Sequence, residues 1–403
     1  MKITKRKEVG GLWVLVLLIG LNLMVFSQDT IALQNDFSES IYPALDDYIE
    51  IPEMFIDTDE DFGPAEWNFP GDGSPGNPFI IENYNVTSGG PFGILIDASG
   101  GPHAFNVSFI IRNCIVTALE VCIKIVDAYP NLVKIENCIC SGTIAGDGIG
   151  IHLVRCDGAI LTDNTCNFNH HTGIRLDTTA GAVLTGNTCQ NNGDEGIYLD
   201  NASDNCILNS NTLTLNVYGF WDQISHGTLL NYNVIANNSF EGILVYDSSN
   251  VVIENNTIET NGGVSADGIY FSNADNAQVI FNEIIGNGGY GLNMDEYSNY
   301  NVIHHNNFIQ NNQGGVQGKE DYTTGHQNAT WYDVAIQEGN FWFDYVGPGV
   351  YNIDGTCANT DPFPLGSQVI ITTIVIPEFS LNLIGLILTL SIFGLVIIFI
   401  KRK

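Results

Sequence analysis

A short pattern recurs roughly every 23 residues through most of the chain. Each unit has an Asn, an apolar residue or Cys two positions later, a second Asn five positions after the first, and then a Gly followed by an apolar residue. Units of this length bury their apolar faces only against one another, so the pattern predicts a solenoid. The first Asn falls at Asn164, Asn187, Asn211, Asn233, Asn256, Asn282 and Asn307, and the second at Asn169, Asn192, Asn216, Asn238, Asn261, Asn287 and Asn312.

The residues of the repeat favour strands over helices. They are rich in Asn, Gly, Thr, Ile and Val, and segments such as Ile174 to Leu176 alternate apolar with polar residues. Asn tolerates the left-handed backbone of a tight corner, and stacked Asn side chains can form a hydrogen-bonded ladder. We therefore expect an all-β fold, a right-handed single-stranded parallel β-helix of about ten or eleven coils.

The repeat also divides the chain into domains. Residues 71–317 carry the coils, residues 29–70 are acidic and irregular, and residues 318–366 depart from the pattern. A bare solenoid end exposes unpaired strand edges, so we expect the two flanking segments to be amino-terminal and carboxy-terminal caps.

The two ends of the chain indicate export and anchoring. Residues 1–28 have the basic start and apolar run of a signal peptide, although no cleavage site stands out. Residues 367–380 are a short linker, residues 381–400 are an uncharged stretch long enough for a transmembrane helix, and residues 401–403 are a basic tail expected in the cytoplasm. The sequence thus predicts a location on the extracellular face of the cell membrane.

The chain is strongly acidic, with a formal net charge of −32. Such a surface repels phosphate backbones, which excludes nucleic acid as a partner, whereas it suits an exported protein in a saline setting. Six Asn-x-Ser/Thr sequons are consistent with a glycoprotein. They lie at Asn85, Asn106, Asn201, Asn237, Asn255 and Asn328.

We expect most of the nine cysteines to be core residues. Cys166 and Cys189 occupy the apolar position of the repeat, where a free thiol behaves as a small hydrophobe. Cys114 and Cys138 hold equivalent places on neighbouring coils, and a disulfide between them is left open. No Cys-x-x-Cys spacing supports a zinc site. The apolar position is held elsewhere by Ile115, Ile139, Leu213, Ile235, Ile258, Ile284 and Ile309.

One outward face of the predicted coils gathers aromatic and charged residues. If the residue after each Gly points inward, the next residue and the one two further on point outward. Aromatic rings on an open face suit the apolar faces of sugars, and carboxylates accept their hydroxyls, so we expect a polysaccharide or cell-surface glycan as partner. A purely structural pairing of Arg175 with Asp177 or Asp200 is the alternative. The candidate ligand-binding residues are His152, Arg175, Tyr198, Trp221, Tyr270 and Asp295.

The same face allows an enzymatic hypothesis. Asp177 and Asp200 are expected on adjacent coils, at a separation suited to a retaining glycosidase, with Arg175, Tyr198 and His152 as further catalytic candidates. Lyases, glycosidases and uronate epimerases of polysaccharides share the predicted fold, but none of their signature motifs occurs. Whether the protein is an enzyme stays open, with binding preferred.

Calcium is a possible cofactor near the Gly turns. Asp147, Asp194, Glu195 and Asp267 are carboxylates of the type that Ca²⁺ prefers. No loop has the spacing of a known calcium-binding repeat, so the prediction rests on residue type alone.

Two terminal motifs and the coils resemble those of NosD-like right-handed parallel β-helix proteins of archaeal surfaces. The motifs are GDGSPGNPFIIE at residues 71–82, and GNFWFDYVGPGVYNIDG at residues 339–355 with DPFPLG at residues 361–366. The segment Pro-Glu-Phe at residues 377–379 is similar to an archaeal PEF-CTERM sorting signal, which implies an archaeosortase as partner, with a retained single-pass anchor as the alternative.

The resemblance also implies copper handling, which would need Met, His or Cys grouped on one exposed face. Met is scarce, and the two His pairs, at residues 170–171 and 304–305, lie on distant coils. The sequence therefore favours an exported, anchored β-helix that binds extended carbohydrate or is structural. A polysaccharide-active enzyme and a copper-handling protein are the alternatives.

Overall fold

The computed structural model describes residues 48–371 except 65, 100–103, 264 and 324–327. The predicted signal peptide, the first part of the amino-terminal cap, the PEF-like motif, the predicted transmembrane helix and the basic tail lie outside the described residues. Within the described part of the chain, no helix has the length and apolar character needed to cross a membrane.

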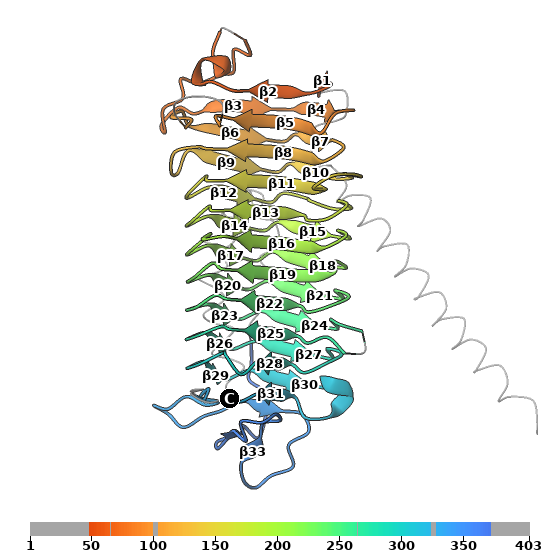
Figure 1. The fold of residues 1–403 in the computed structure, drawn as a ribbon, viewed down its shortest axis with the longest axis vertical. Coiled ribbons are helices and arrows are strands. Elements are labelled where there is room, and N and C mark those ends of the chain that lie inside the picture. Colours follow the sequence, from red (N-terminus) through yellow and green to blue (C-terminus); the bar gives the residue numbers. More distant parts are fainter. Residues whose placement is uncertain (1–47, 65, 100–103, 264, 324–327, 372–403) are drawn as a thin grey trace, which may run out of the picture. The chain divides into compact units, whose positions relative to one another are not determined.

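The described chain winds into a parallel β-helix, as predicted (Figure 1). Sheet I, the most regular, has eleven strands and carries the candidate residues. Its strands are β2 (Met54–Ile56), β5 (Phe92–Asp97), β8 (Val121–Val126), β11 (Ile149–Val154), β13 (Ile174–Asp177), β16 (Glu195–Asp200), β19 (Tyr218–Gln223), β22 (Ile243–Tyr246), β25 (Ile269–Ser272), β28 (Leu292–Met294) and β31 (Gly318–Glu320).

Sheet II has ten parallel strands. They are β3 (Phe79–Glu82), β6 (Phe109–Arg112), β9 (Val133–Glu136), β12 (Ile160–Thr162), β14 (Val183–Thr185), β17 (Ile207–Asn209), β20 (Leu229–Asn231), β23 (Val252–Glu254), β26 (Gln278–Ile280) and β29 (Val302–His304).

Sheet III consists of a four-stranded and a seven-stranded block. The first block is β1 (Ile49–Ile51), β4 (Tyr84–Thr87), β7 (Ile115–Thr117) and β10 (Ile139–Cys140); the second is β15 (Thr188–Gln190), β18 (Thr212–Thr214), β21 (Val234–Ala236), β24 (Thr257–Glu259), β27 (Glu283–Ile285), β30 (Asn307–Ile309) and β32 (Phe341–Trp342).

The remaining elements are short. The 3₁₀ turns η2 (Asp59–Phe62) and η3 (Asn312–Gly314) and the antiparallel pair β33 (Tyr351–Asn352) and β34 (Thr360–Asp361) flank the regular coils.

Nine coils contribute a strand to each of the three sheets, which gives about nine complete turns in the described chain. In the coil of β12 and β13, Thr165 joins sheet III only through isolated bridges to Ile139 and Thr188. The prediction of ten or eleven coils was therefore too high for the described residues.

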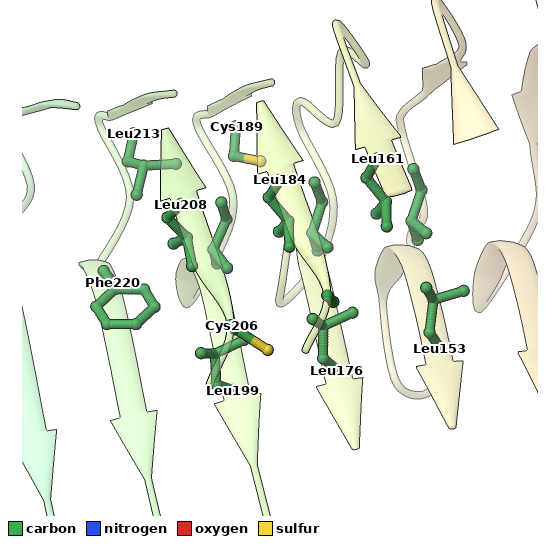
Figure 2. Close-up of a cluster of buried hydrophobic side chains, with 14 of the residues drawn as sticks. Leu153, Leu161, Leu176, Leu184, Cys189, Leu199, Cys206, Leu208, Leu213 and Phe220 are labelled. Atoms are coloured by element: carbon green, nitrogen blue, oxygen red, sulfur yellow. The ribbon is translucent and has the colours of Figure 1, made fainter. Parts of the chain in front are cut away.

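The core is a set of columns along the coils. Ile151, Ile174, Ile197 and Phe220 are in register on successive strands of sheet I and are fully buried. Figure 2 shows Cys189 and Cys206 among the leucines of this core.

The predicted core position in sheet III needs a correction at three coils. Cys166 and Cys189 are buried, as expected. Ile115, Ile139 and Ile309, however, are half-buried on the outer face, and the inward residues are their neighbours. Since strand side chains alternate between faces, a one-residue shift in the alignment exchanges inside for outside. The inward residues are Val116, Cys140 and Phe308.

Two ladders of buried Asn hold the corners, as predicted. In each, one Asn side-chain oxygen accepts both the backbone and the side-chain N–H of the Asn one coil before; Asn211, for example, accepts from Asn187 at 2.9 and 3.0 Å. In the last coil the ladders run through Asn306 and Asn311 rather than Asn307 and Asn312. The sequence has two adjacent Asn at each place, which made the register ambiguous.

The repeated Gly is required by close approach of the next coil. A Cβ atom at Gly173 would lie 2.6 Å from the carbonyl oxygen of Gly196 and 2.9 Å from Nδ2 of Asn192. Any side chain there would push the coils apart.

All nine cysteines are unpaired, and eight are buried. Cys114 and Cys138 do occupy equivalent corners, but they replace the ladder Asn: the Cys138 amide donates to Asn164 Oδ1 at 3.0 Å. The disulfide that the sequence left open is therefore absent between these two residues.

Aromatic side chains close both ends of the described core. Phe62 of η2 packs on Phe79 and Phe109 at ring distances of 5.4 and 5.0 Å. At the other end Trp342 stacks between Phe308 and Tyr351, at 4.5 and 4.1 Å.

A candidate ligand-binding face on sheet I

The outer surface of sheet I aligns the predicted residues in two rows. His152, Arg175, Tyr198 and Trp221 are direct partners on consecutive strands from β11 to β19. Asp177 and Asp200 pair in the neighbouring row. The repeat register therefore placed these side chains correctly relative to one another.

A chain of polar contacts joins the two rows. Nε2 of His152 lies 2.7 Å from Oδ2 of Asp177. Arg175 donates from Nη2 to Asp177 at 3.2 Å and to Asp200 at 2.9 Å. His152 and Asp200 are each only 6% exposed, which corrects the expectation that both are open to solvent. The contacts with Asp177 and Arg175 bury His152 and Asp200 in the network.

The two carboxyl groups of this network have opposite pKa shifts. Burial raises the pKa of Asp177, but the hydrogen bond from His152 and the charge of Arg175 outweigh burial and hold it at about 2. Burial and the neighbouring Asp177 raise the pKa of Asp200 from its usual value. The two pKa values move apart because two adjacent carboxylates resist ionising together.

Four aromatic rings continue the face beyond Arg175. The Arg175 guanidinium lies 5.1 Å from the Tyr198 ring centroid, and Tyr198 lies 5.4 Å from Trp221. Trp221 contacts Tyr218 at 5.1 Å, and Tyr218 contacts Phe240 at 5.6 Å. We call Tyr198, Trp221, Tyr218 and Phe240 the aromatic strip. Sequence reasoning missed Tyr218 and Phe240, because they precede the Gly of their coils rather than follow it.

A shallow pocket of about 250 Å³ lies at the Arg175 end of the strip. Glu195 is buried there and accepts a hydrogen bond from Thr172 Oγ1 at 2.6 Å. Burial raises the pKa values of both Asp194 and Glu195. The pocket is lined by Gly146, Asp147, His171, Thr172, Arg175, Asp194, Glu195 and Tyr198.

Two predicted ligand-binding residues lie apart from the strip. Tyr270 is half-buried on β25, and buried Leu244 separates it from Trp221 in the same row. Asp295 accepts hydrogen bonds from Ser272 and Ser298 and so stabilises a turn.

The candidate calcium ligands do not form one group. Asp147, Asp194 and Glu195 line the pocket, whereas Asp267 accepts from the Tyr290 amide at 2.6 Å and from Asn293 at 2.7 Å. Burial raises the pKa of Asp267 to about 6. Among the described residues, the group of three donors close enough to share a metal ion is instead His304, His305 and Asp333.

The sequons differ in accessibility. Asn85 and Asn255 are half-buried and donate hydrogen bonds to Glu50 and Asn231. The exposed ones are Asn106, Asn201, Asn237 and Asn328.

Some solved structures are similar to this chain at low sequence identity. A mannuronan C-5 epimerase A-module of Azotobacter vinelandii is 14% identical, with a TM-score of 0.48 over 72% of this chain and 85% of that one. A periplasmic alginate epimerase is 14% identical, with a TM-score of 0.41 over 71% and 84%. A DFA-IIIase of Arthrobacter chlorophenolicus is also 14% identical, with a TM-score of 0.43 over 68% and 70%.

None of the curated proteins matches the sequence. The family model described as periplasmic copper-binding protein (NosD) matches three overlapping stretches, residues 76–209, 109–241 and 172–347. These stretches cover most of the described coils, so the chain belongs to the NosD family.

Proposed function

We propose that this chain is an exported cell-surface protein whose sheet I face binds an extended carbohydrate. The observation that carries the proposal is the aromatic strip, in which rings from successive coils contact one another beside a pocket lined by polar groups.

The strip suits sugar rings for two reasons. Aromatic faces pack against the C–H faces of sugars, and parallel strands about 4.8 Å apart repeat such faces along one direction. The pocket beside it offers a cation at Arg175 and carboxyl oxygens at Asp194 and Glu195, which bind hydroxyl groups. A linear chain of sugars can contact both at once.

The cell-surface location rests on the sequence. We propose that residues 1–28 direct export and that residues 381–400 anchor the protein, either as a retained span or as a segment processed at the PEF-like motif by an archaeosortase. Exposure of four sequons, among them Asn201 and Asn237, is consistent with this location.

A polysaccharide-active enzyme is the second candidate, favoured by the opposite pKa shifts of Asp177 and Asp200. Acid–base catalysis uses two carboxyl groups whose environments push their pKa values apart. The network argues for binding instead, because Asp200 is 6% exposed and hydrogen-bonded to Arg175. Turnover of a polysaccharide that survives Asp177→Asn and Asp200→Asn would remove these two residues from any mechanism.

Copper, which the family description names, does not fit this face. Copper prefers thiolate, thioether or imidazole donors. The face offers His152, whose Nε2 is hydrogen-bonded to Asp177, and His171 in the pocket, and neither belongs to the group of three donors that lie close enough to share an ion among the described residues. The buried thiols of the described coils point into the core instead. We therefore assign copper no part in carbohydrate binding.

A glycan array probed with the full chain tests the proposal. Retention of an extended glycan by the wild-type protein, with loss in Trp221→Ala and Tyr198→Ala, is the expected result. Tyr129→Ala is the matched control, because Tyr129 is an exposed aromatic residue outside the strip. Equal retention by all the variants, or no retention by the wild type, would contradict the proposal.

A further inference from the structure

The last coil carries a cluster of metal-binding donors far from the carbohydrate face. His304 ends β29, and His305 follows it with a positive φ of 57°. Consecutive strand residues normally point to opposite faces, but this left-handed corner turns the two rings toward each other. Their Nδ1 atoms lie 2.7 Å apart.

A hairpin from the non-repeating segment supplies the third donor. The backbone of Asp333 pairs with that of Glu338, with the Asp333 amide 2.7 Å from the Glu338 oxygen. Hydrogen bonds from Ile303 to Thr330 and from His305 to Gly339, both 2.8 Å, fix this hairpin against β29. As a result, one donor atom from each of His304, His305 and Asp333 lies within 4.8 Å of the others.

Glu338 completes the arrangement behind the ligands. Its Oε2 lies 3.0 Å from Nε2 of His305 and accepts the Nε2 proton, so Nδ1 of His305 is the acceptor of the 2.7 Å hydrogen bond from Nδ1 of His304. On metal binding the His304 proton would move to Nε2 of the same ring, which leaves both Nδ1 atoms as donors to the ion. A carboxylate behind a histidine in this way orients metal ligands in proteins generally. Phe281 stacks on the His305 ring at 4.9 Å and limits its rotation.

We propose that His304 Nδ1, His305 Nδ1 and the Asp333 carboxylate bind one divalent first-row transition-metal ion. Two imidazoles and one carboxylate suit zinc, cobalt or copper(II), whereas calcium and magnesium prefer oxygen donors. Two nitrogens on one tetrahedral ion lie roughly 3.4 Å apart, so the rings need to separate by less than about 1 Å. Asp333 keeps an oxygen for the metal, because its Oδ1 accepts the Ala335 amide at 2.8 Å. The site is independent of carbohydrate binding.

Co²⁺ titration of the full chain, purified without a histidine tag and stripped with a chelator, tests the site. We expect one Co²⁺ per chain with the visible absorption of a four- or five-coordinate ion, displaced by Zn²⁺; separate Zn²⁺ and Cu²⁺ titrations against a chelating dye rank the metals. His304→Ala and Asp333→Asn should each weaken Co²⁺ binding at least tenfold. Glu338→Gln should also weaken binding, although it leaves all three metal ligands in place.

His170→Ala is the matched control. It disrupts the other adjacent His pair, whose rings lie 4.5 Å apart as against 4.9 Å for His304 and His305. Asp333→Asn retains an oxygen to accept the Ala335 amide, so it tests the charge while keeping the hairpin. Wild-type affinity in both Asp333→Asn and His304→Ala, or equal loss in His170→Ala, would overturn the proposal.

Discussion

The Nη2 atom of Arg175 lies 2.9 Å from the Oδ2 atom of Asp200 on the next coil. The same guanidinium donates a hydrogen bond to Asp177, so one positive charge pairs with two adjacent carboxyl groups. Arg175 thus holds neighbouring coils of sheet I together. It is also the cation that we propose to lie beside a bound sugar.

Loss of the Arg175 charge should destabilise the fold through these carboxyls. Arg175→Met leaves Asp177 and Asp200 side by side without a cation, and we expect a loss of about 1–3 kcal/mol in the free energy of unfolding at pH 7. Urea unfolding measures it. The double variant Arg175→Met, Asp200→Asn should regain much of the loss, and a double variant no more stable than the single one would show that like-charge repulsion is not the cause.

We expect the stability of the fold to depend on pH through the buried carboxyl group of Asp222. It stands in the core row of sheet I between Leu199 and Val245, where burial raises its pKa to about 7, offset only in part by its hydrogen bond with Ser248. The folded state thus favours the protonated form. The contribution of Asp222 to the free energy of unfolding is therefore fully present below its pKa in the unfolded chain, about 4, and is lost as the pH rises through its folded pKa of about 7.

The loss should reach up to about 4 kcal/mol, an upper bound from the pKa difference. Asp222→Asn keeps the size of the side chain without a titrating group, so its melting temperature should change less between pH 5 and pH 8 than that of the wild type. Parallel pH profiles for the two proteins would show that Asp222 does not titrate in this range.

The Asn ladder should account for a large share of local stability. In Asn211→Ala the amide of Asn187 and the carbonyl of Leu184 lose buried partners at 2.9 Å, which should cost at least about 2 kcal/mol. Asn209→Ala is the matched control, because Asn209 lies on the outer face of β17 in the same coil and should change stability by less than about 0.5 kcal/mol. Similar losses in both variants would contradict a special role for the ladder.

The cysteines should all be found as thiols. Because all nine are unpaired, alkylation of the unfolded chain without a reductant should add nine labels. In the folded protein, burial of the other eight leaves Cys357 as the most accessible thiol, and it should react first. Mass spectrometry distinguishes these outcomes, and two missing labels before reduction would reveal a disulfide.

Much of this architecture could be predicted from the repeat. The spacing of Asn and Gly gave the parallel β-helix, the ladders and the alignment of Arg175, Tyr198 and Trp221, because each coil repeats the same steric requirements. Errors arose where two neighbouring residues both satisfied the pattern, as at Asn306 and Asn307. Either residue fits the repeat equally well, but shifting the alignment by one residue exchanges the inner and outer faces of a strand.

Other features depended on contacts that the repeat does not encode. The burial of His152 follows from its bond to Asp177, and the aromatic strip includes Tyr218 from a position outside the outward rows. The metal-binding cluster joins His304 to Asp333, which belongs to a segment without the repeat. The adjacent histidines were the sole sequence signal for it.

The most direct test of the carbohydrate proposal is calorimetric titration of the full chain with the extended glycan that the array identifies. The account predicts that Trp221→Ala weakens binding roughly tenfold or more, as loss of a stacking aromatic ring should, while Tyr129→Ala binds like the wild type. Equal affinities for Trp221→Ala and Tyr129→Ala would show that the aromatic strip is not where the carbohydrate binds.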